Sequence, residues 1–217
     1  LVLGASGLLL AFYLLPLVSL IATQPPAEVA ARLSDADVLR AAGVSLATAS
    51  VTTVLAAVLG VPLAYALSRS TGRWKQLVTA AVVLPLIFPP IVSGMLLLTI
   101  VGPNTLIGGL AGSVGVPLTR SFAAVVLAQT FVASPFVVVT AKAAFDGIPK
   151  SLEHASRLLG KSRWTTFRRV SLPLARSGIV AGLTLAFARS IGEFGATIMM
   201  AYYPRTMPVQ IWVAFTT

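Results

Sequence analysis

The sequence predicts an all-α integral membrane protein, a polytopic helical bundle, and three observations lead to this prediction. Of the 217 residues, 57% are hydrophobic and only 10% are charged, and the mean hydropathy is +0.92. A soluble domain carries about 25% charged residues, so this chain has too few charges to cover a surface in water. The other two observations are a set of long apolar stretches and a biased placement of the basic residues.

A helix needs roughly 20 apolar residues to cross the hydrocarbon core of a membrane. Five stretches are long enough, and they are residues 2–22, 42–67, 76–101, 121–141 and 177–202. The first stretch is too long for a signal peptide and has no basic segment before it. Because the chain begins with Leu1 and not with Met, we expect residues upstream of it.

The last nine residues, 209–217, turn apolar again but are too short to cross a bilayer. We interpret them as the start of a sixth span. The alternative is an anchor at the membrane interface, built on Trp212 and Phe215.

The basic residues orient these spans. The formal net charge is +10, with sixteen Lys and Arg against six acids. Eleven of the sixteen lie in segments 68–75 and 142–176, and they are Arg69, Arg73, Lys75, Lys142, Lys150, Arg157, Lys161, Arg163, Arg168, Arg169 and Arg176. The alternate loops hold only Arg32, Arg40, Arg120 and Arg205. Basic loops stay in the cytoplasm, so both segments are predicted to be cytoplasmic.

Two spans carry small residues at every fourth position. These residues are Thr52, Ala56, Gly60 and Ala64 in the second span and Gly178, Gly182, Ala186 and Ser190 in the fifth. Small residues allow the close helix contacts on which packing in lipid depends. The stripes therefore predict tight packing inside a bundle, would also suit a dimer contact, and indicate no chemistry.

Prolines interrupt the third span at Pro85, Pro89 and Pro90. Each removes a backbone donor and clashes with the carbonyl four residues earlier, so this helix must be kinked or broken inside the membrane. Broken helices are typical of transport pathways, which makes Pro89 and Pro90 candidates for one. A bent helix with a purely structural role is the alternative.

Segment 142–176 is the longest polar stretch. Pro149 and Ser151 are start signals for a helix, and Gly160 is a stop signal. The apolar face of this helix carries Leu152, Ala155 and Leu159, and another face carries Glu153 and Arg157. Ser162 can cap a second short helix that contains Trp164 and Phe167 and ends before Pro173. The apolar face needs a partner, either protein or the lipid interface.

The sequence argues against nucleotide binding, nucleic-acid recognition and metal binding. Gly160-Lys161-Ser162 is similar to the end of a phosphate-binding loop, but Ala155 stands where that loop needs glycine. The basic helix pair is joined at both ends to membrane spans, which favours lipid headgroups or a cytoplasmic protein over nucleic acid as its partner. We therefore expect no nucleic-acid partner. With no cysteine and one histidine, a Cys–zinc site or a multi-histidine metal site is impossible within one chain.

The same segment resembles the EAA loop of ABC importer permeases. That pattern is Glu-Ala-Ala, three residues, Gly, nine residues, Ile, any residue, Leu-Pro. Here it reads His154-Ala155-Ser156, then Gly160, then Val170-Ser171-Leu172-Pro173, with the nine-residue interval intact. His154 stands in place of the family's Glu, and Glu153 stands one position early.

A second motif narrows the resemblance. Residues 192–197, Gly-Glu-Phe-Gly-Ala-Thr, resemble a segment of molybdate permeases that sulfate permeases share in looser form. Residues 201–204, Ala-Tyr-Tyr-Pro, are similar to the molybdate/tungstate branch. The resemblance implies one ABC importer transmembrane domain over residues 1–217, with its coupling loop at 142–176. It also implies six helices, which favours a missing sixth span.

The resemblance further implies partners and roles. The permease would pair with a second copy of itself, two cytoplasmic ATPase subunits and an external oxyanion-binding protein, in contact with membrane lipid. The chain would need no cofactor and catalyse no reaction, since ATP and Mg²⁺ act in the ATPase. Coupling to the ATPase is expected at Ser151, Glu153, His154, Ala155, Leu159 and Gly160. A sulfate or thiosulfate permease is the alternative within this class, and an ion-coupled carrier or a channel is the alternative outside it.

Arg189 and Glu193 are opposite charges inside the fifth span. Four residues apart on a helix, they share a face and can pair. An unpaired charge at this depth costs about 2.5–3.5 kcal/mol, so both should face the bundle interior or a cavity. They are either a neutralised structural pair or part of an oxyanion pathway.

Overall fold

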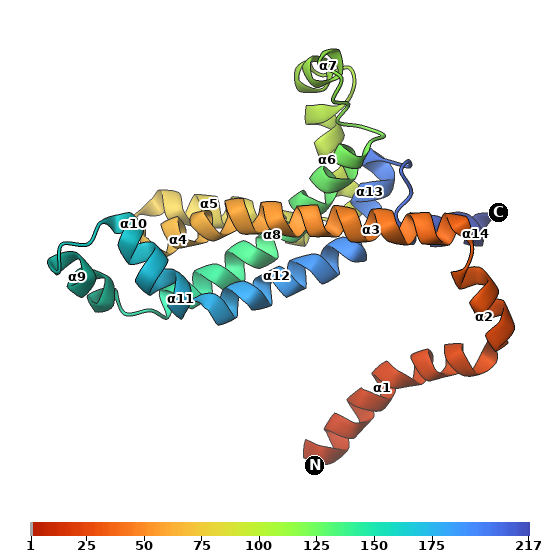
Figure 1. The fold of residues 1–217 in the computed structure, drawn as a ribbon, viewed down its shortest axis with the longest axis horizontal. Coiled ribbons are helices and arrows are strands. Elements are labelled where there is room, and N and C mark those ends of the chain that lie inside the picture. Colours follow the sequence, from red (N-terminus) through yellow and green to blue (C-terminus); the bar gives the residue numbers. More distant parts are fainter. Residues whose placement is uncertain (1) are drawn as a thin grey trace. The chain divides into compact units, whose positions relative to one another are not determined.

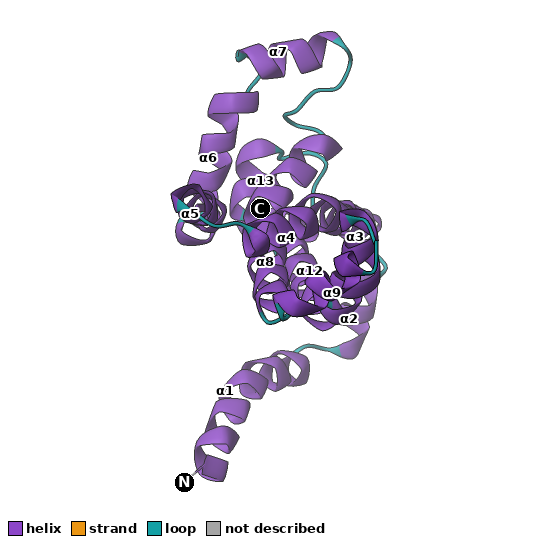
Figure 2. Ribbon diagram, turned by 90° about the vertical axis from the view of Figure 1, so that its left-hand side faces the viewer, coloured by secondary structure: helices purple, strands orange, loops and turns teal. Residues whose placement is uncertain are grey.

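The computed structural model describes residues 2–217, and all regular secondary structure in this range is helical (Figures 1 and 2). The chain forms two compact units that divide between Arg40 and Ala41. The first contains α1 (Val2–Thr23) and α2 (Pro26–Leu33). Helix α1 is long and apolar enough to cross a membrane, in agreement with the first predicted span.

The second predicted span is one long helix of 34 residues, Ala36–Arg69. It consists of α3 (Ala36–Leu55), the π-helical turn η1 (Ala56–Gly60) and α4 (Val61–Arg69). It extends beyond the predicted 42–67 at both ends: exposed polar residues such as Asp37 and Arg40 continue it at the start, and buried Ser68 and half-buried Arg69 continue it at the end.

The third predicted span is broken, as its prolines require. Helix α5 (Arg73–Ile87) meets α6 (Pro90–Val101) at an angle of 119°. Phe88 between them is extended, with φ −71° and ψ 140°, the conformation that a following proline favours. Pro85, in contrast, lies inside α5 without ending it. Helix α7 (Leu106–Ser113) follows α6.

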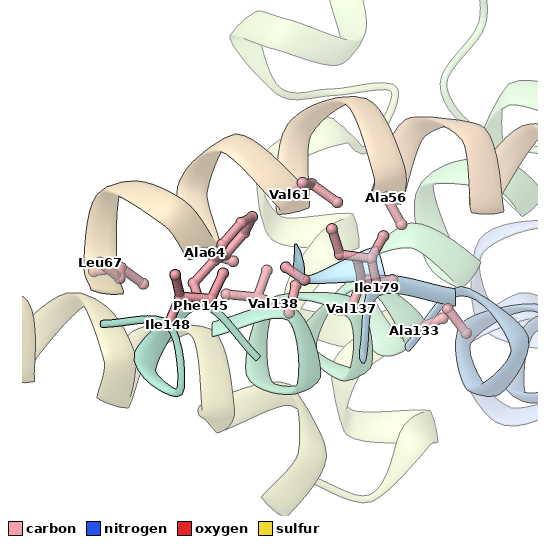
Figure 3. Close-up of a cluster of buried hydrophobic side chains, with 13 residues drawn as sticks. Ala56, Val61, Ala64, Leu67, Ala133, Val137, Val138, Phe145, Ile148 and Ile179 are labelled. Carbon is pink, nitrogen blue, oxygen red and sulfur yellow. The ribbon is translucent and has the colours of Figure 1, made fainter. Parts of the chain in front are cut away.

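Helix α8 (Phe122–Asp146) contains the fourth predicted span and begins at a Ser121 cap whose hydroxyl accepts a hydrogen bond from the Ala124 N–H. It lies alongside α4 and α12 (Arg176–Ile191), as both ribbon views show. The core between these helices consists mainly of small and β-branched side chains, with Leu67 of α4 and Phe145 of α8 as its larger members, and α12 contributes Ile179 and Ala186 (Figure 3).

Both small-residue stripes pack against α8, which confirms the predicted tight packing. A Cβ added at Gly60 would lie 3.3 Å from the Val138 side chain. On the other side, a Cβ at Gly178 would lie 3.3 Å from the Thr140 carbonyl oxygen. The other members of both stripes that carry side chains, Thr52, Ala56, Ala64, Ala186 and Ser190, are buried.

Segment 142–176 forms the predicted helix pair, with one correction. The first helix is α9 (Lys150–Leu158). The second was expected to end before Pro173, but it continues through α10 (Arg163–Thr166), the π-helical turn η2 (Phe167–Ser171) and α11 (Leu172–Leu174). Pro173 lies at the start of α11, directly after the π-helical turn η2, and does not end the helix. The chain then bends by 72° into α12.

The fifth span was predicted as one continuous stretch, 177–202, and this is wrong. Helix α12 ends at Ile191, and α13 (Gly195–Met200) begins after a non-helical link. The chain leaves α12 at Gly192, and the Glu193 carboxylate stabilises the start of α13 by accepting a hydrogen bond from the Ala196 N–H. Helix α14 (Met207–Thr216) ends the chain. Its ten residues cover all but the last residue of the apolar stretch 209–217, for which both interpretations stay predictions.

Three described helices are long and apolar enough to cross a membrane, and five if each bent pair forms one span. The second bent pair joins 163–174 to 176–191 and so includes part of the predicted cytoplasmic loop.

Candidate functional site: the coupling loop and the broken spans

Glu153 ties the coupling loop to the membrane helices. It is the buried residue of α9, and its side chain is only 7% exposed. Its carboxylate lies 2.8 Å from an Arg69 guanidinium nitrogen at the end of α4 and accepts a 2.7 Å hydrogen bond from the Ser171 hydroxyl of η2. The Tyr65 hydroxyl donates a further hydrogen bond of 3.3 Å. Three segments distant in sequence are therefore joined at one carboxylate.

Arg69 extends this junction to α8. Its guanidinium donates to the Phe145 carbonyl oxygen at 2.9 Å and to the Ile148 carbonyl oxygen at 3.4 Å. Phe145 is in the last turn of α8 and Ile148 lies just beyond it, so the guanidinium is placed at the negative end of the helix dipole, where a cation is favoured. The Tyr65 ring also packs against two phenylalanines, and its centroid lies 5.2 Å from that of Phe145 and 4.7 Å from that of Phe167.

These contacts set the charge state of Glu153. Burial by itself raises the pKa of the Glu153 carboxyl, but hydrogen bonds from Arg69 and Ser171 and the charge of Arg69 hold the pKa below its ordinary value. Glu153 is therefore an anion at neutral pH, and the junction is a buried ion pair whose acceptor oxygens are satisfied.

Apart from half-buried Ser156, the rest of α9 is exposed. Of the residues expected to couple to the ATPase, Ser151, His154, Ala155, Leu159 and Gly160 face outward, and only Glu153 is buried. The predicted apolar face therefore has no partner among the described residues. Leu158, which the sequence analysis did not include in that face, is 88% exposed.

The predicted glycine stop has a specific geometry. Gly160 has φ +76°, in the left-handed region that favours glycine. The Gly160 N–H donates to the Arg157 carbonyl and the Lys161 N–H to the Ser156 carbonyl, as in a Schellman motif. Ser162 then caps α10 as predicted, since its hydroxyl accepts from the Thr165 N–H. These bonds fix the turn between α9 and α10.

The two broken spans meet close to their breaks. Helices α6 and α13 pack against each other, with a glycine on each side of the contact. A Cβ at Gly195 would lie 2.8 Å from the Pro90 Cβ, and one at Gly94 would lie 2.8 Å from the Ala196 carbonyl oxygen. Pro90 is thus brought against the segment that follows Glu193, whereas Pro89 remains exposed.

Arg189 and Glu193 form the predicted ion pair, although they do not lie on one continuous helix. The Glu193 side chain is 1% exposed and the Arg189 side chain is 28% exposed. Glu193 also accepts a 2.7 Å hydrogen bond from the Ala196 N–H and so caps α13. The carboxylate therefore has a structural role, while one side of the guanidinium is open.

Gln129 was missed by sequence reasoning and links three spans near the same break. Its side chain is buried in α8 and donates to the Ser190 carbonyl at 3.0 Å. It accepts from the Thr52 hydroxyl of α3 at 3.2 Å. A lone glutamine in an apolar stretch was the available signal, because such a side chain needs partners inside a membrane.

Replacing Glu153 with glutamine tests the junction. We expect a loss of about 2 kcal/mol of unfolding free energy at neutral pH, because a charged hydrogen-bond acceptor is lost. Because the pKa of the Glu153 carboxyl is lower in the folded than in the unfolded protein, its ionised form stabilises the folded state at pH values above the unfolded pKa of about 4.3. This stabilisation is lost as the pH falls through the folded pKa. The difference between wild type and variant, measured by thermal unfolding, should therefore shrink in acid.

The control is Glu28→Gln, which changes an exposed glutamate of α2 and should have no such effect. An equal destabilisation by Glu153→Gln at every pH would contradict a role for the charge.

Comparison with known proteins places the chain in a family. Residues 56–215 match the model of the binding-protein-dependent transport system inner membrane component. A probable molybdenum ABC transporter permease protein of Haloferax volcanii is 56% identical over 97% of this chain and 77% of its own length. The molybdenum transport system permease protein ModB of Mycobacterium bovis is 42% identical, over 80% of this chain and 67% of its own.

A molybdate/tungstate transport system permease protein, WtpB of Pyrococcus abyssi, is 35% identical over 84% of this chain and 68% of its own length. The family match includes the coupling loop and both broken spans described above. The chain therefore belongs to the binding-protein-dependent transport system inner membrane components, and it is an ABC permease subunit, a membrane transport protein and not an enzyme.

Proposed function

We propose that this permease carries molybdate or tungstate across the cell membrane, driven by ATP hydrolysis in a partner subunit. The relatives are molybdenum and molybdate/tungstate permeases by name, which supports this substrate class, as does the Gly-Glu-Phe-Gly-Ala-Thr segment at 192–197. Sulfate is the second candidate, because it is also a tetrahedral dianion. The observation that carries the transport role is an exposed coupling helix joined to the spans by a buried ion pair.

The coupling helix α9 docks in a groove of the ATPase subunit. Its leucines supply an apolar face, and the Glu153–Arg69 junction transmits its movement to α4 and α8. Closure of the ATPases upon ATP binding then switches the side of the membrane to which the pathway opens. A free-standing ion-coupled carrier has no use for such a loop.

The complete importer contains two copies of this chain, two ATPase subunits and an external oxyanion-binding protein. The family description names a binding-protein-dependent system, which supports this assembly. ATP and Mg²⁺ bind to the ATPase, and the permease itself holds no cofactor. Membrane lipid surrounds the spans.

Arg189 lies on the oxyanion pathway in this proposal. Its guanidinium is partly open, whereas Glu193 is enclosed and holds the α13 N-terminus. The acidic partner limits how strongly the cation holds a dianion, and a pathway must release its substrate. Pro89 and Pro90 stand at the break between α5 and α6 and line the same route. A purely structural ion pair is the alternative.

Uptake into proteoliposomes tests the substrate and the energy source together. With permease, ATPase and binding protein present, labelled molybdate should enter only when ATP is supplied. Excess tungstate should compete, and the same excess of sulfate should not. Uptake driven by an ion gradient without ATP would contradict the importer, and equal competition by sulfate would move the assignment to sulfate.

Gly160 tests the coupling turn. Gly160→Val places a β-branched residue at φ +76° and should strain the turn that orients α9, so that ATP hydrolysis continues while uptake falls about tenfold or more. Gly160→Asn is the matched control, since asparagine tolerates this conformation, and it should keep most uptake. Normal coupling in the valine variant would rule out a need for this turn geometry.

Arg189 is tested without leaving a buried charge unpaired. In the double variant Arg189→Gln with Glu193→Gln, both charges are removed, and the amide oxygen of the glutamine that replaces Glu193 can still accept from the Ala196 N–H. We expect intact assembly with uptake reduced about tenfold, on the order of one 1.4 kcal/mol step in the barrier. Arg189→Lys, which keeps the charge, should preserve most uptake. Normal uptake in the double variant would leave only the structural role.

A further inference from the structure

A basic cavity lies beside the Glu153 junction. Its volume is about 370 Å³, and residues of α4, α9 and α10 line it. Its cationic lining residues besides Arg69 are Lys150, Arg157 and Arg163, and His154 joins them at the wall. All four side chains belong to exposed residues, so the cavity is accessible from the surface of the coupling loop.

The charges of this cavity are not balanced within its own compact unit. Residues 41–217 contain three acids, Asp146, Glu153 and Glu193, and each already pairs with a cation. Glu153 is the acid at the cavity, and Arg69 neutralises it. Within residues 2–217, no ion pair involves Lys150, Arg157 or Arg163. Three like charges around one cavity repel one another, so the site favours an anionic occupant.

The occupant must also cover apolar surface. Leu158 and Leu159, at the C-terminal end of α9, are 88% and 78% exposed and follow Arg157 directly in the chain. Figure 1 shows α9 projecting at the end of the bundle formed by α4, α8 and α12. A protein groove offers an apolar floor and fixed carboxylates together, whereas a lipid headgroup layer offers charge without a shaped apolar partner.

We infer that this cavity receives one or two carboxylate side chains of the cytoplasmic ATPase subunit. The inference rests on the proposed function and adds to it the polarity of the contact: the permease supplies the cations and the ATPase the acids. Such ion pairs fix the register of α9 in the groove and reject a groove with basic walls, because charge complementarity mainly gives specificity. These ion pairs lie beside the Arg69–Glu153 junction, so a movement of the ATPase carboxylates is transmitted to α4 through Arg69.

Charge reversal in the full importer tests this contact. Arg157→Glu and Arg163→Glu should each weaken binding of the ATPase to the purified permease by about tenfold or more, since like charges then meet. Arg157→Gln and Arg163→Gln, which remove the charge without reversing it, should each weaken ATPase binding less than the corresponding change to Glu. Lys161→Glu is the matched control, because Lys161 is an exposed cation between α9 and α10 that does not line the cavity. Its effect should stay below about threefold.

Two further measurements identify the occupant. Replacing single surface acids of the ATPase with Arg should, for at least one position, restore binding to Arg157→Glu. Affinities should be compared in nanodiscs of phosphatidylcholine alone and with added phosphatidylglycerol. A loss that appears only with the anionic lipid would overturn the inference in favour of a headgroup.

The outcomes separate this inference from the proposed function. If wild-type permease binds the ATPase and takes up molybdate while the Arg157 and Arg163 variants behave like Lys161→Glu, only the cavity assignment is wrong. If wild type binds no ATPase at all, the importer proposal itself fails. Thermal unfolding of each variant checks that weaker ATPase binding does not result from unfolding of the permease.

Discussion

Close packing around α8 is the constraint on which the rest of the structure depends. Between helices in lipid, apolar burial gives little advantage, so contact area and hydrogen bonds hold the bundle together. Gly60 on one side and Gly178 and Gly182 on the other have no side chain of their own, so two helices approach α8 closely at these positions. Larger residues at these places would push α4 or α12 away, and the polar contacts described above would lose their geometry.

Two polar connections then attach the functional parts to this packed frame. Near the predicted cytoplasmic end, Arg69 joins the last carbonyls of α8 to the coupling loop through Glu153. Nearer the break of the fifth span, Gln129 of α8 joins Thr52 to the Ser190 carbonyl. Hydrogen bonds are directional, so each connection fixes an orientation that apolar packing alone would leave free. Such oriented contacts let a movement of the coupling loop be transmitted to the membrane helices.

Sequence reasoning found the features that depend on neighbours along the chain. The stop at Gly160, the cap at Ser162 and the break before Pro89 all arise from local backbone chemistry. The Arg189–Glu193 pair was found through its spacing, but the continuous helix assumed for it was wrong, since Glu193 uses one oxygen to cap α13. The Glu153 junction could not be found this way, because 84 residues separate its two charges and nothing local specifies that Arg69 is the partner.

The position of Glu153 also changes how the coupling motif works. On a free amphipathic helix, an acid opposite the leucines would face water or the ATPase. Here it is buried toward the spans, so the outward surface of α9 keeps its leucines, histidine and cations without a balancing acid. A buried carboxylate without its arginine would be costly, and this cost holds the helix in one orientation. The inner face of α9 therefore provides rigidity, and recognition is left to the outer face.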